Sequence, residues 1–103
     1  MAKVGQPYSS GRWTVKDGKE EEFIAAWLDF VGWAMKTHPE FEPPVLLKDD
    51  GDPKDFISVG PWADKKSRDA WRADPEFKPR IGKIVALCDD FTPHDMTCVA
   101  TPG

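Results

Sequence analysis

Apolar and polar residues alternate along residues 11–16, the first regular pattern in the chain. Trp13 and Val15 fall on one side of this stretch, and Arg12 and Thr14 fall on the other. Side chains of a strand point alternately to its two faces, so the pattern predicts a half-buried strand.

The next segment carries apolar residues at helical spacing and predicts one long helix that ends near Thr37. Asp17, with Glu20 three residues later, predicts a capping box at its start. The proline after His38 ends it, because a residue before proline disfavours helical angles. Trp33 lies outside the apolar arc, and we expect a partner subunit to cover it. The arc contains Phe23, Ile24, Trp27, Leu28, Phe30, Val31, Ala34 and Met35.

The remainder of the chain predicts a hairpin of two short strands, two helices and a last strand. In chain order these elements span residues 45–48, 56–59, 65–73, 75–88 and 96–100. Asp64 and Asp74 are the expected N-caps of the two helices. Pro93 suits an edge or a bulge at the start of the last strand.

This order of strand, helix, two strands, two helices and strand is typical of the α+β, ferredoxin-like split βαβ class with a four-stranded antiparallel sheet. We expect a flexible lead-in over residues 1–9 and a single domain over residues 10–103. The helices cover one face of such a sheet. The other face would be exposed unless a second copy covers it, so the pattern predicts a homodimer related by a two-fold axis.

Composition adds an excess of indole rings to this picture, with five Trp and six Phe against one Tyr in 103 residues. The rings must form an aromatic core, a dimer interface or a pocket for a flat apolar ligand.

The net charge is −4 and basic residues are scattered, which argues against nucleic-acid binding. No apolar run approaches a membrane span and no signal-peptide core is present, so we expect a cytoplasmic protein without membrane contact. Cys88 and Cys98 are too few and poorly spaced for a disulfide framework or zinc site, and we expect ordinary buried thiols.

Three segments resemble the antibiotic biosynthesis monooxygenase family. They are residues 11–23 (GRWTVKDGKEEEF), 56–62 (FISVGPW) and 70–77 (AWRADPEF), and the likeness covers roughly residues 10–100. The resemblance implies a dimeric α+β barrel with a pocket between sheet and helices in each subunit. Members of the family include cofactor-independent monooxygenases of polycyclic phenols and quinols, haem-degrading enzymes and proteins of unknown activity.

The two enzymatic branches of the family match this chain unequally. The haem-degrading branch shares Trp62 but needs an Asn where Gly11 stands and an axial His where Ile81 stands. An aliphatic side chain cannot ligate iron, so haem degradation is disfavoured. The quinol-oxidising branch uses a polar strand residue at the position of Ser58 and an Arg near Arg80. The resemblance therefore implies a monooxygenase that needs no cofactor and no metal and combines an aromatic small molecule with dioxygen.

The candidate substrate-binding residues each have a structural alternative. Trp62 either stacks on a flat substrate or belongs to the core. Ser58 either faces a ligand or bonds to backbone. Trp27, Phe30 and Phe77 either line a pocket or pack the core.

The candidate catalytic residues are His38 and Arg80. His38 either takes a phenolic proton or caps the helix C-terminus. Arg80 either stabilises a phenolate or developing superoxide, or lies on a solvated helix face beside Glu76. A non-catalytic homodimeric module that binds aromatic small molecules fits the same residues, so it remains the alternative function.

Overall fold

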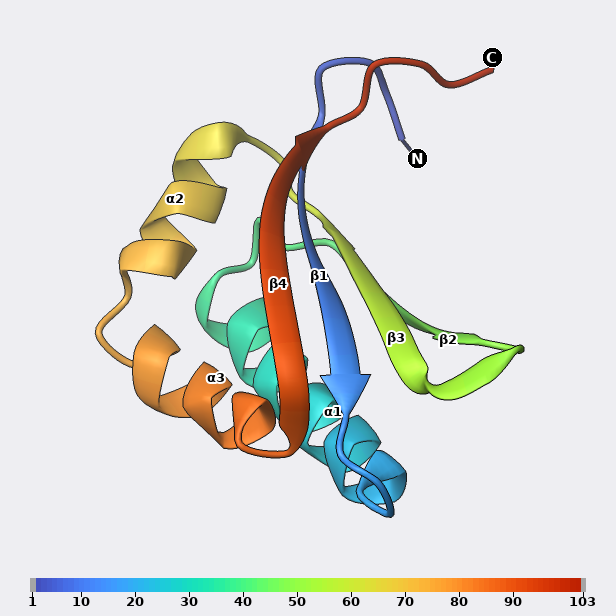
Figure 1. The fold of residues 1–103 in the computed structure, drawn as a ribbon. Helices are drawn as coiled ribbons and strands as arrows, with labels where there is room; N and C mark the ends of the chain where they lie inside the picture. Colours follow the sequence, from blue (N-terminus) through green and yellow to red (C-terminus); the bar gives the residue numbers. More distant parts are fainter. Residues whose placement is uncertain (1, 103) are drawn as a thin grey trace.

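The computed structural model describes residues 2–102, which form one antiparallel sheet and three helices (Figure 1). The strands are β1 (Pro7–Val15), β2 (Val45–Asp49), β3 (Asp52–Pro61) and β4 (Cys88–Thr97). The helices are α1 (Glu20–Thr37), α2 (Lys65–Ala73) and α3 (Phe77–Val85). The sheet order is β2-β3-β1-β4, with every neighbouring pair antiparallel. The predicted α+β ferredoxin-like class is confirmed.

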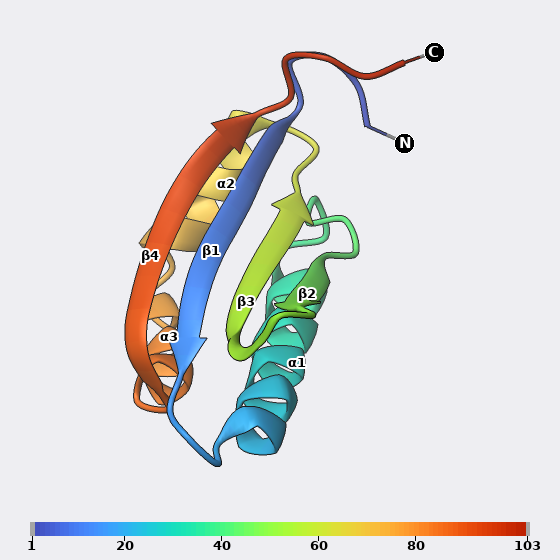
Figure 2. The ribbon, with the colours of Figure 1, turned by 45° about the vertical axis from the view of Figure 1, so that its right-hand side comes forward.

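All three helices lie on one side of the sheet, and the opposite face is open (Figure 2). Alternation in β1 follows the prediction, since Trp13 and Val15 are buried beneath the helices and Arg12 is exposed. The strand begins at Pro7, four residues earlier than predicted, so the lead-in expected over residues 1–9 is shorter. No helix within residues 2–102 is long and apolar enough to cross a membrane.

Helix α1 buries the centre of its predicted arc at Phe23, Trp27, Phe30, Val31 and Ala34. The predicted capping box is wrong. The N-cap is Lys19 and makes no side-chain cap bond. Gly18 has a φ of 76°, and this left-handed turn delays the start of the helix. The acidic first turn, which suits the helix dipole, remains.

Aspartates shape both shorter helices. The backbone N–H of Ser67 donates to Asp64 Oδ1 at 2.7 Å, which confirms the predicted cap of α2 and lowers the pKa of Asp64. The N–H of Glu76 donates to Asp74 Oδ1 at 2.9 Å in the turn that precedes α3. The structure assigns Glu76 itself as the N-cap, so α3 starts later than predicted.

The predicted last strand is misplaced. β4 spans Cys88–Thr97 and pairs with β1, whereas the prediction put a strand over residues 96–100 and Cys88 in a helix. Pro93 lies inside β4 opposite Gly11 and is tolerated because β4 is an edge strand. Most β4 side chains are exposed, so the strand carries no apolar alternation for a sequence reading to detect.

The two free cysteines differ. Cys88 is buried, and burial raises its pKa to about 11. Cys98 is only half-buried beyond the end of β4, so the expectation of two buried thiols is wrong for it.

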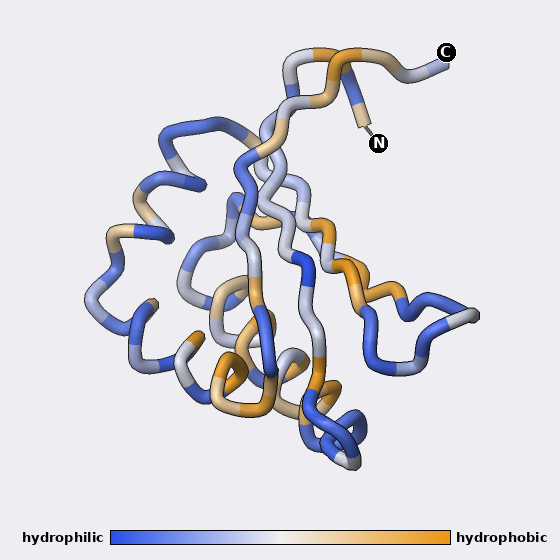
Figure 3. The backbone as a smooth tube through the Cα atoms, in the orientation of Figure 1, coloured by the Kyte–Doolittle hydropathy of each residue, from blue (hydrophilic) through white to orange (hydrophobic). Residues whose placement is uncertain are grey.

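The open face of the sheet carries an apolar patch on β2 and β3, formed by Val45, Leu47, Ile57 and Val59. Val45 lies opposite Val59, and Leu47 lies opposite Ile57, so the four side chains share a face. Apolar positions recur along these two strands (Figure 3). Val45, Leu47 and Ile57 are 51%, 56% and 45% exposed. We call these four residues the β2–β3 patch.

Candidate functional site

A cavity of about 150 Å³ lies between the sheet and the helices. Both central strands supply its floor, and all three helices contribute to its walls. Its lining is mostly apolar and aromatic, which is typical of small-molecule sites. The lining residues are Ser9, Ser10, Gly11, Trp13, Trp27, Phe30, Val31, Phe41, Pro44, Ser58, Val59, Gly60, Trp71, Arg72, Phe77, Ile81, Phe91 and Pro93.

Two glycines on the floor bring aromatic rings against the sheet. A Cβ on Gly11 would lie 2.8 Å from a ring carbon of Phe91, and one on Gly60 would lie 2.5 Å from a ring carbon of Phe41. The space directly over both glycines is therefore filled by rings, and the cavity extends beyond them.

Two serines add hydroxyl groups to the floor. The indole Nε1 of Trp13 donates to Ser58 Oγ at 3.0 Å, and that of Trp62 donates to Ser9 Oγ at 3.1 Å. Ser9 lies opposite Gly60, and Ser58 lies opposite Gly11. The two serines and the two glycines therefore alternate around one small area of the floor. The serine hydroxyls occupy two diagonal corners of this area within an otherwise aromatic site.

The predicted substrate-binding residues separate into two groups. Trp27, Phe30, Ser58 and Phe77 line the cavity. Trp62 does not line it and has 0% exposed surface. Its ring stacks on Phe41 with centroids 4.4 Å apart, so Trp62 supports a wall residue from behind.

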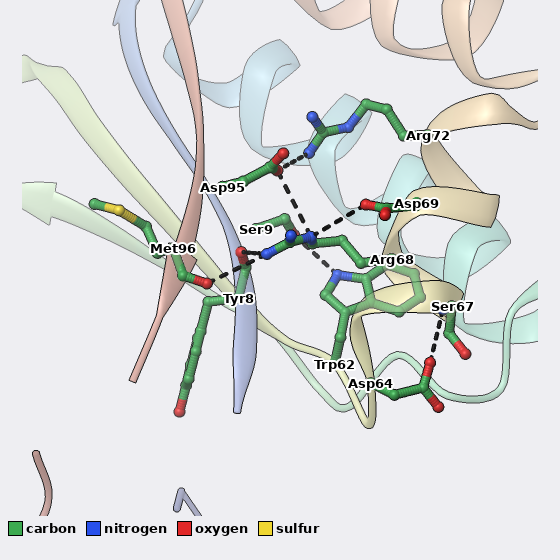
Figure 4. A network of polar contacts seen from close by, with 10 residues as sticks. All are labelled: Tyr8, Ser9, Trp62, Asp64, Ser67, Arg68, Asp69, Arg72, Asp95 and Met96. Carbon is green, nitrogen blue, oxygen red and sulfur yellow. Dashed lines mark hydrogen bonds and ion pairs between the residues drawn. The ribbon is translucent and has the colours of Figure 1, made fainter. Parts of the chain in front are cut away.

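Within residues 2–102, Arg72 is the one charged residue of the lining, and no sequence pattern predicted it there. Its Nη2 lies 2.7 Å from Asp95 Oδ1 (Figure 4), and its guanidinium lies over the ring of Trp71 at 5.3 Å. The Nε of Arg72 is buried and has no hydrogen-bond partner. The prediction placed the last strand at residues 96–100, so Asp95 lay outside the predicted sheet. Its contact with Arg72 could therefore not be predicted.

Arg68 holds the same acidic side chain from the other side. It is 5% exposed, and its Nε lies 3.8 Å from Asp95 Oδ1. Its Nη1 donates to the carbonyl oxygens of Tyr8 and Met96 at 3.1 and 3.3 Å. Arg68 thus ties α2 to both strands beneath it and fixes the carboxylate that orients Arg72 (Figure 4).

The two predicted catalytic residues lie outside the cavity lining. His38 Nε2 lies 2.9 Å from Asp74 Oδ2, which joins the end of α1 to the turn before α3. The pKa of Asp74 is lowered, first by the hydrogen bond from the backbone of Glu76 and then by that from His38.

Arg80 lies on the outer side of α3. Its Nη2 lies 3.0 Å from Glu76 Oε1, and its guanidinium is 4.8 Å from the ring centroid of Trp33. Part of the cover expected for Trp33 therefore comes from Arg80 of the same chain.

Gly11 and Ile81, the positions where the family resemblance implies an Asn and an axial His in the haem-degrading branch, both line the cavity. Within residues 2–102 no group of three or more His, Cys, Asp or Glu side chains is placed to hold a metal ion.

A family model described as antibiotic biosynthesis monooxygenase matches residues 9–79. The chain belongs to this family. SnoaB, a cofactor-independent oxygenase from Streptomyces nogalater, has a similar structure, with a TM-score of 0.82, 20% identity, and 95% of this chain and 97% of SnoaB covered. A conserved protein from Methanosarcina mazei is similar with a TM-score of 0.79, 15% identity, and 91% and 93% coverage. No curated protein sequence matches the chain. The structural likenesses show the shared fold of this monooxygenase family.

Proposed function

We propose that this protein is a cofactor-independent monooxygenase that oxidises a flat aromatic phenol or quinol with dioxygen. The observation that carries the proposal is an apolar, aromatic cavity whose lining includes one charged residue, Arg72, with its guanidinium over the rings of Trp71 and Phe77. Membership of the monooxygenase family supports the reaction class.

The proposed reaction draws its electrons from the substrate. Loss of a proton gives an electron-rich anion, which passes one electron to dioxygen. The substrate radical and superoxide then combine into a peroxide, and loss of water leaves a carbonyl group. One oxygen atom enters the product and the other leaves as water, so the reaction needs no external reductant.

Arg72 is the residue we propose to stabilise the negative charge that develops in this sequence. A cation held by Asp95 against aromatic rings is oriented before the substrate arrives, and preorganised charge stabilises negative charge that develops beside it. His38 and Arg80 would contribute through neighbouring side chains rather than by contact, because neither lines the cavity.

Cavity volume limits the part of the substrate that can be enclosed. A dry cavity of about 150 Å³ holds a single benzene-sized ring, and drug-sized ligands need roughly 300 Å³ or more. We therefore propose that one ring of the substrate is buried and that any further ring extends toward the opening.

We also propose that the protein is a homodimer that covers the open face of its sheet. The β2–β3 patch leaves large apolar side chains about half exposed on that face. Contact with the same face of a second copy would remove them from water.

Oxygen uptake with a panel of anthrones and naphthoquinols tests the reaction. We expect one dioxygen consumed per substrate, and one ¹⁸O atom in the product when ¹⁸O₂ is supplied. Measurable binding without uptake would contradict the oxygenase and leave the non-catalytic binding module. A Soret shift with ring opening on haem titration under reducing conditions would instead support haem degradation.

A further inference from the structure

The two central strands carry the same five-residue pattern. β1 has Ser9, Gly11 and Trp13 at alternate positions, and β3 has Ser58, Gly60 and Trp62 in the same spacing. The strands are antiparallel and in register so that each serine lies opposite the glycine of the other strand. The two patterns are thus related by a local two-fold axis that passes through the cavity floor.

Each indole bonds to the serine of the opposite strand. An indole N–H can only donate, so both serine oxygens must act as acceptors in these bonds. The hydroxyl hydrogens remain available as donors. Within residues 2–102, neither hydroxyl donates its hydrogen to a protein acceptor.

Both hydroxyls lie on the helix-covered face of the sheet, because Ser9 alternates with the buried Trp13 and Ser58 with the buried Phe56. Ser9 and Ser58 both line the cavity, and each oxygen would lie 3.2 Å from a Cβ on the glycine across from it. The two serines are diagonal neighbours of an antiparallel pair, so they stand about 7 Å apart. This spacing suits two oxygens on opposite sides of one ring and is too wide for adjacent oxygens.

We propose that Ser9 and Ser58 form a paired donor site for a ring that carries two oxygens in para positions, as in a hydroquinone or quinone. The inference deepens the proposed function and rests on it, because it names the substrate class of the same cavity. Ser58 was a candidate from the sequence, whereas Ser9 lay in the predicted lead-in. Trp13 and Trp62 are positioning residues, since their indoles fix each hydroxyl as an acceptor and leave its hydrogen for the ligand.

Three tetramethyl-substituted six-membered rings with different numbers of oxygens test the pairing. Durene has none, 2,3,5,6-tetramethylphenol has one, and duroquinone has two. Their binding is measured by calorimetry without any turnover, so the readout is independent of oxygenase activity. We expect duroquinone to bind tightest. Ser9→Ala and Ser58→Ala should each weaken duroquinone about threefold to tenfold, since a neutral hydrogen bond contributes modestly. Durene binding should change less than about twofold.

Two further sets of variants keep the result interpretable. Each Ser→Ala change leaves a buried indole N–H without an acceptor, so Ser9→Ala is also combined with Trp62→Phe, and Ser58→Ala with Trp13→Phe. The second change removes the unpaired donor. Ser67→Ala, at the first turn of α2 outside the cavity, is the matched control and should leave all three affinities unchanged.

The pairing is overturned if duroquinone binds no tighter than durene, or if the serine changes weaken all three compounds alike. Serine-dependent duroquinone binding without oxygen uptake on any quinol would contradict the proposed function and leave the paired site standing. Quinol turnover with a KM that both serine changes leave unaffected would contradict the paired site and leave the proposed function standing.

Discussion

The ring of Phe41 lies directly against the backbone of Gly60, where Cε1 is 2.5 Å from the position of a Cβ. Phe41 is 5% exposed and stacks on Trp62, which has no exposed surface, so the ring cannot move away freely. The wall of the cavity therefore depends on the missing side chain of a strand residue.

Gly60→Ala should destabilise the fold by about 1–3 kcal/mol, because an added methyl group forces buried rings to shift. The cavity should also change shape, since Phe41 and Gly60 both line it. Urea unfolding gives the free energy of unfolding for the variant and the wild type.

Gly32→Ala is the matched control. A Cβ at Gly32 meets nothing within 4 Å, and the residue lies in the middle of α1. Alanine there should stabilise the protein by about 0.5–1 kcal/mol through helix propensity. Equal effects of the two changes would contradict the close approach of Phe41 to Gly60.

Arg72→Gln should lower the turnover of an established quinol substrate on the order of 100-fold, the usual cost of losing a preorganised group that stabilises transition-state charge. Asp95→Asn should lower it less, because the guanidinium remains but loses the partner that orients it. Steady-state oxygen uptake measures both.

Arg80→Gln separates the two arginines. Arg80 bonds to Glu76 and covers Trp33 outside the cavity, so its loss should leave turnover within a few-fold of the wild type. A loss as large as that of Arg72→Gln would restore Arg80 as the catalytic arginine, as the family resemblance implies.

Periodicity was enough to predict most of the fold. The alternation around Trp13 and the arc around Phe30 report burial directly, because half-buried elements repeat with the spacing of their backbone. Ser58 could be placed at the site because it shares a face with the buried Phe56. The exposed edge strand β4 has no such repeat and was misplaced.

Arg72 and Ser9 were missed for a related reason. Arg72 is oriented by Asp95, which lies on the strand that was misplaced. Ser9 accepts a hydrogen bond from the indole of Trp62, which is fifty-three residues away in the sequence. Contacts between distant segments leave no periodic signal. The repeated Ser-x-Gly-x-Trp pattern is the one local signal that could have revealed Ser9.

Charge on the β2–β3 patch should separate the proposed dimer. Leu47→Lys combined with Ile57→Glu replaces two half-exposed apolar side chains that face each other across the strands. We expect the mass measured by sedimentation at micromolar concentration to fall from that of a dimer to that of a monomer. Leu28→Glu is the control, since Leu28 is 57% exposed on α1, away from the sheet face. A folded wild-type monomer at that concentration would contradict the dimer.

The contact of His38 with Asp74 predicts how stability depends on pH. The pKa of Asp74 is lowered from 3.8, chiefly by the Glu76 N–H and also by His38. Because the folded state favours the charged carboxylate, Asp74 stabilises the protein above its ordinary pKa. That contribution is lost as the pH falls through the lower, folded value.

Asp74→Asn keeps an oxygen that can accept from Glu76, so it removes mainly the charge. Urea unfolding from about pH 2 to pH 7 should show the wild type more stable than this variant near neutrality, with the difference shrinking below about pH 4. Asp50→Asn, in the exposed β2–β3 turn, should show little difference at any pH. A difference between wild type and Asp74→Asn that grows on acidification would reverse the sign and refute the assigned contact.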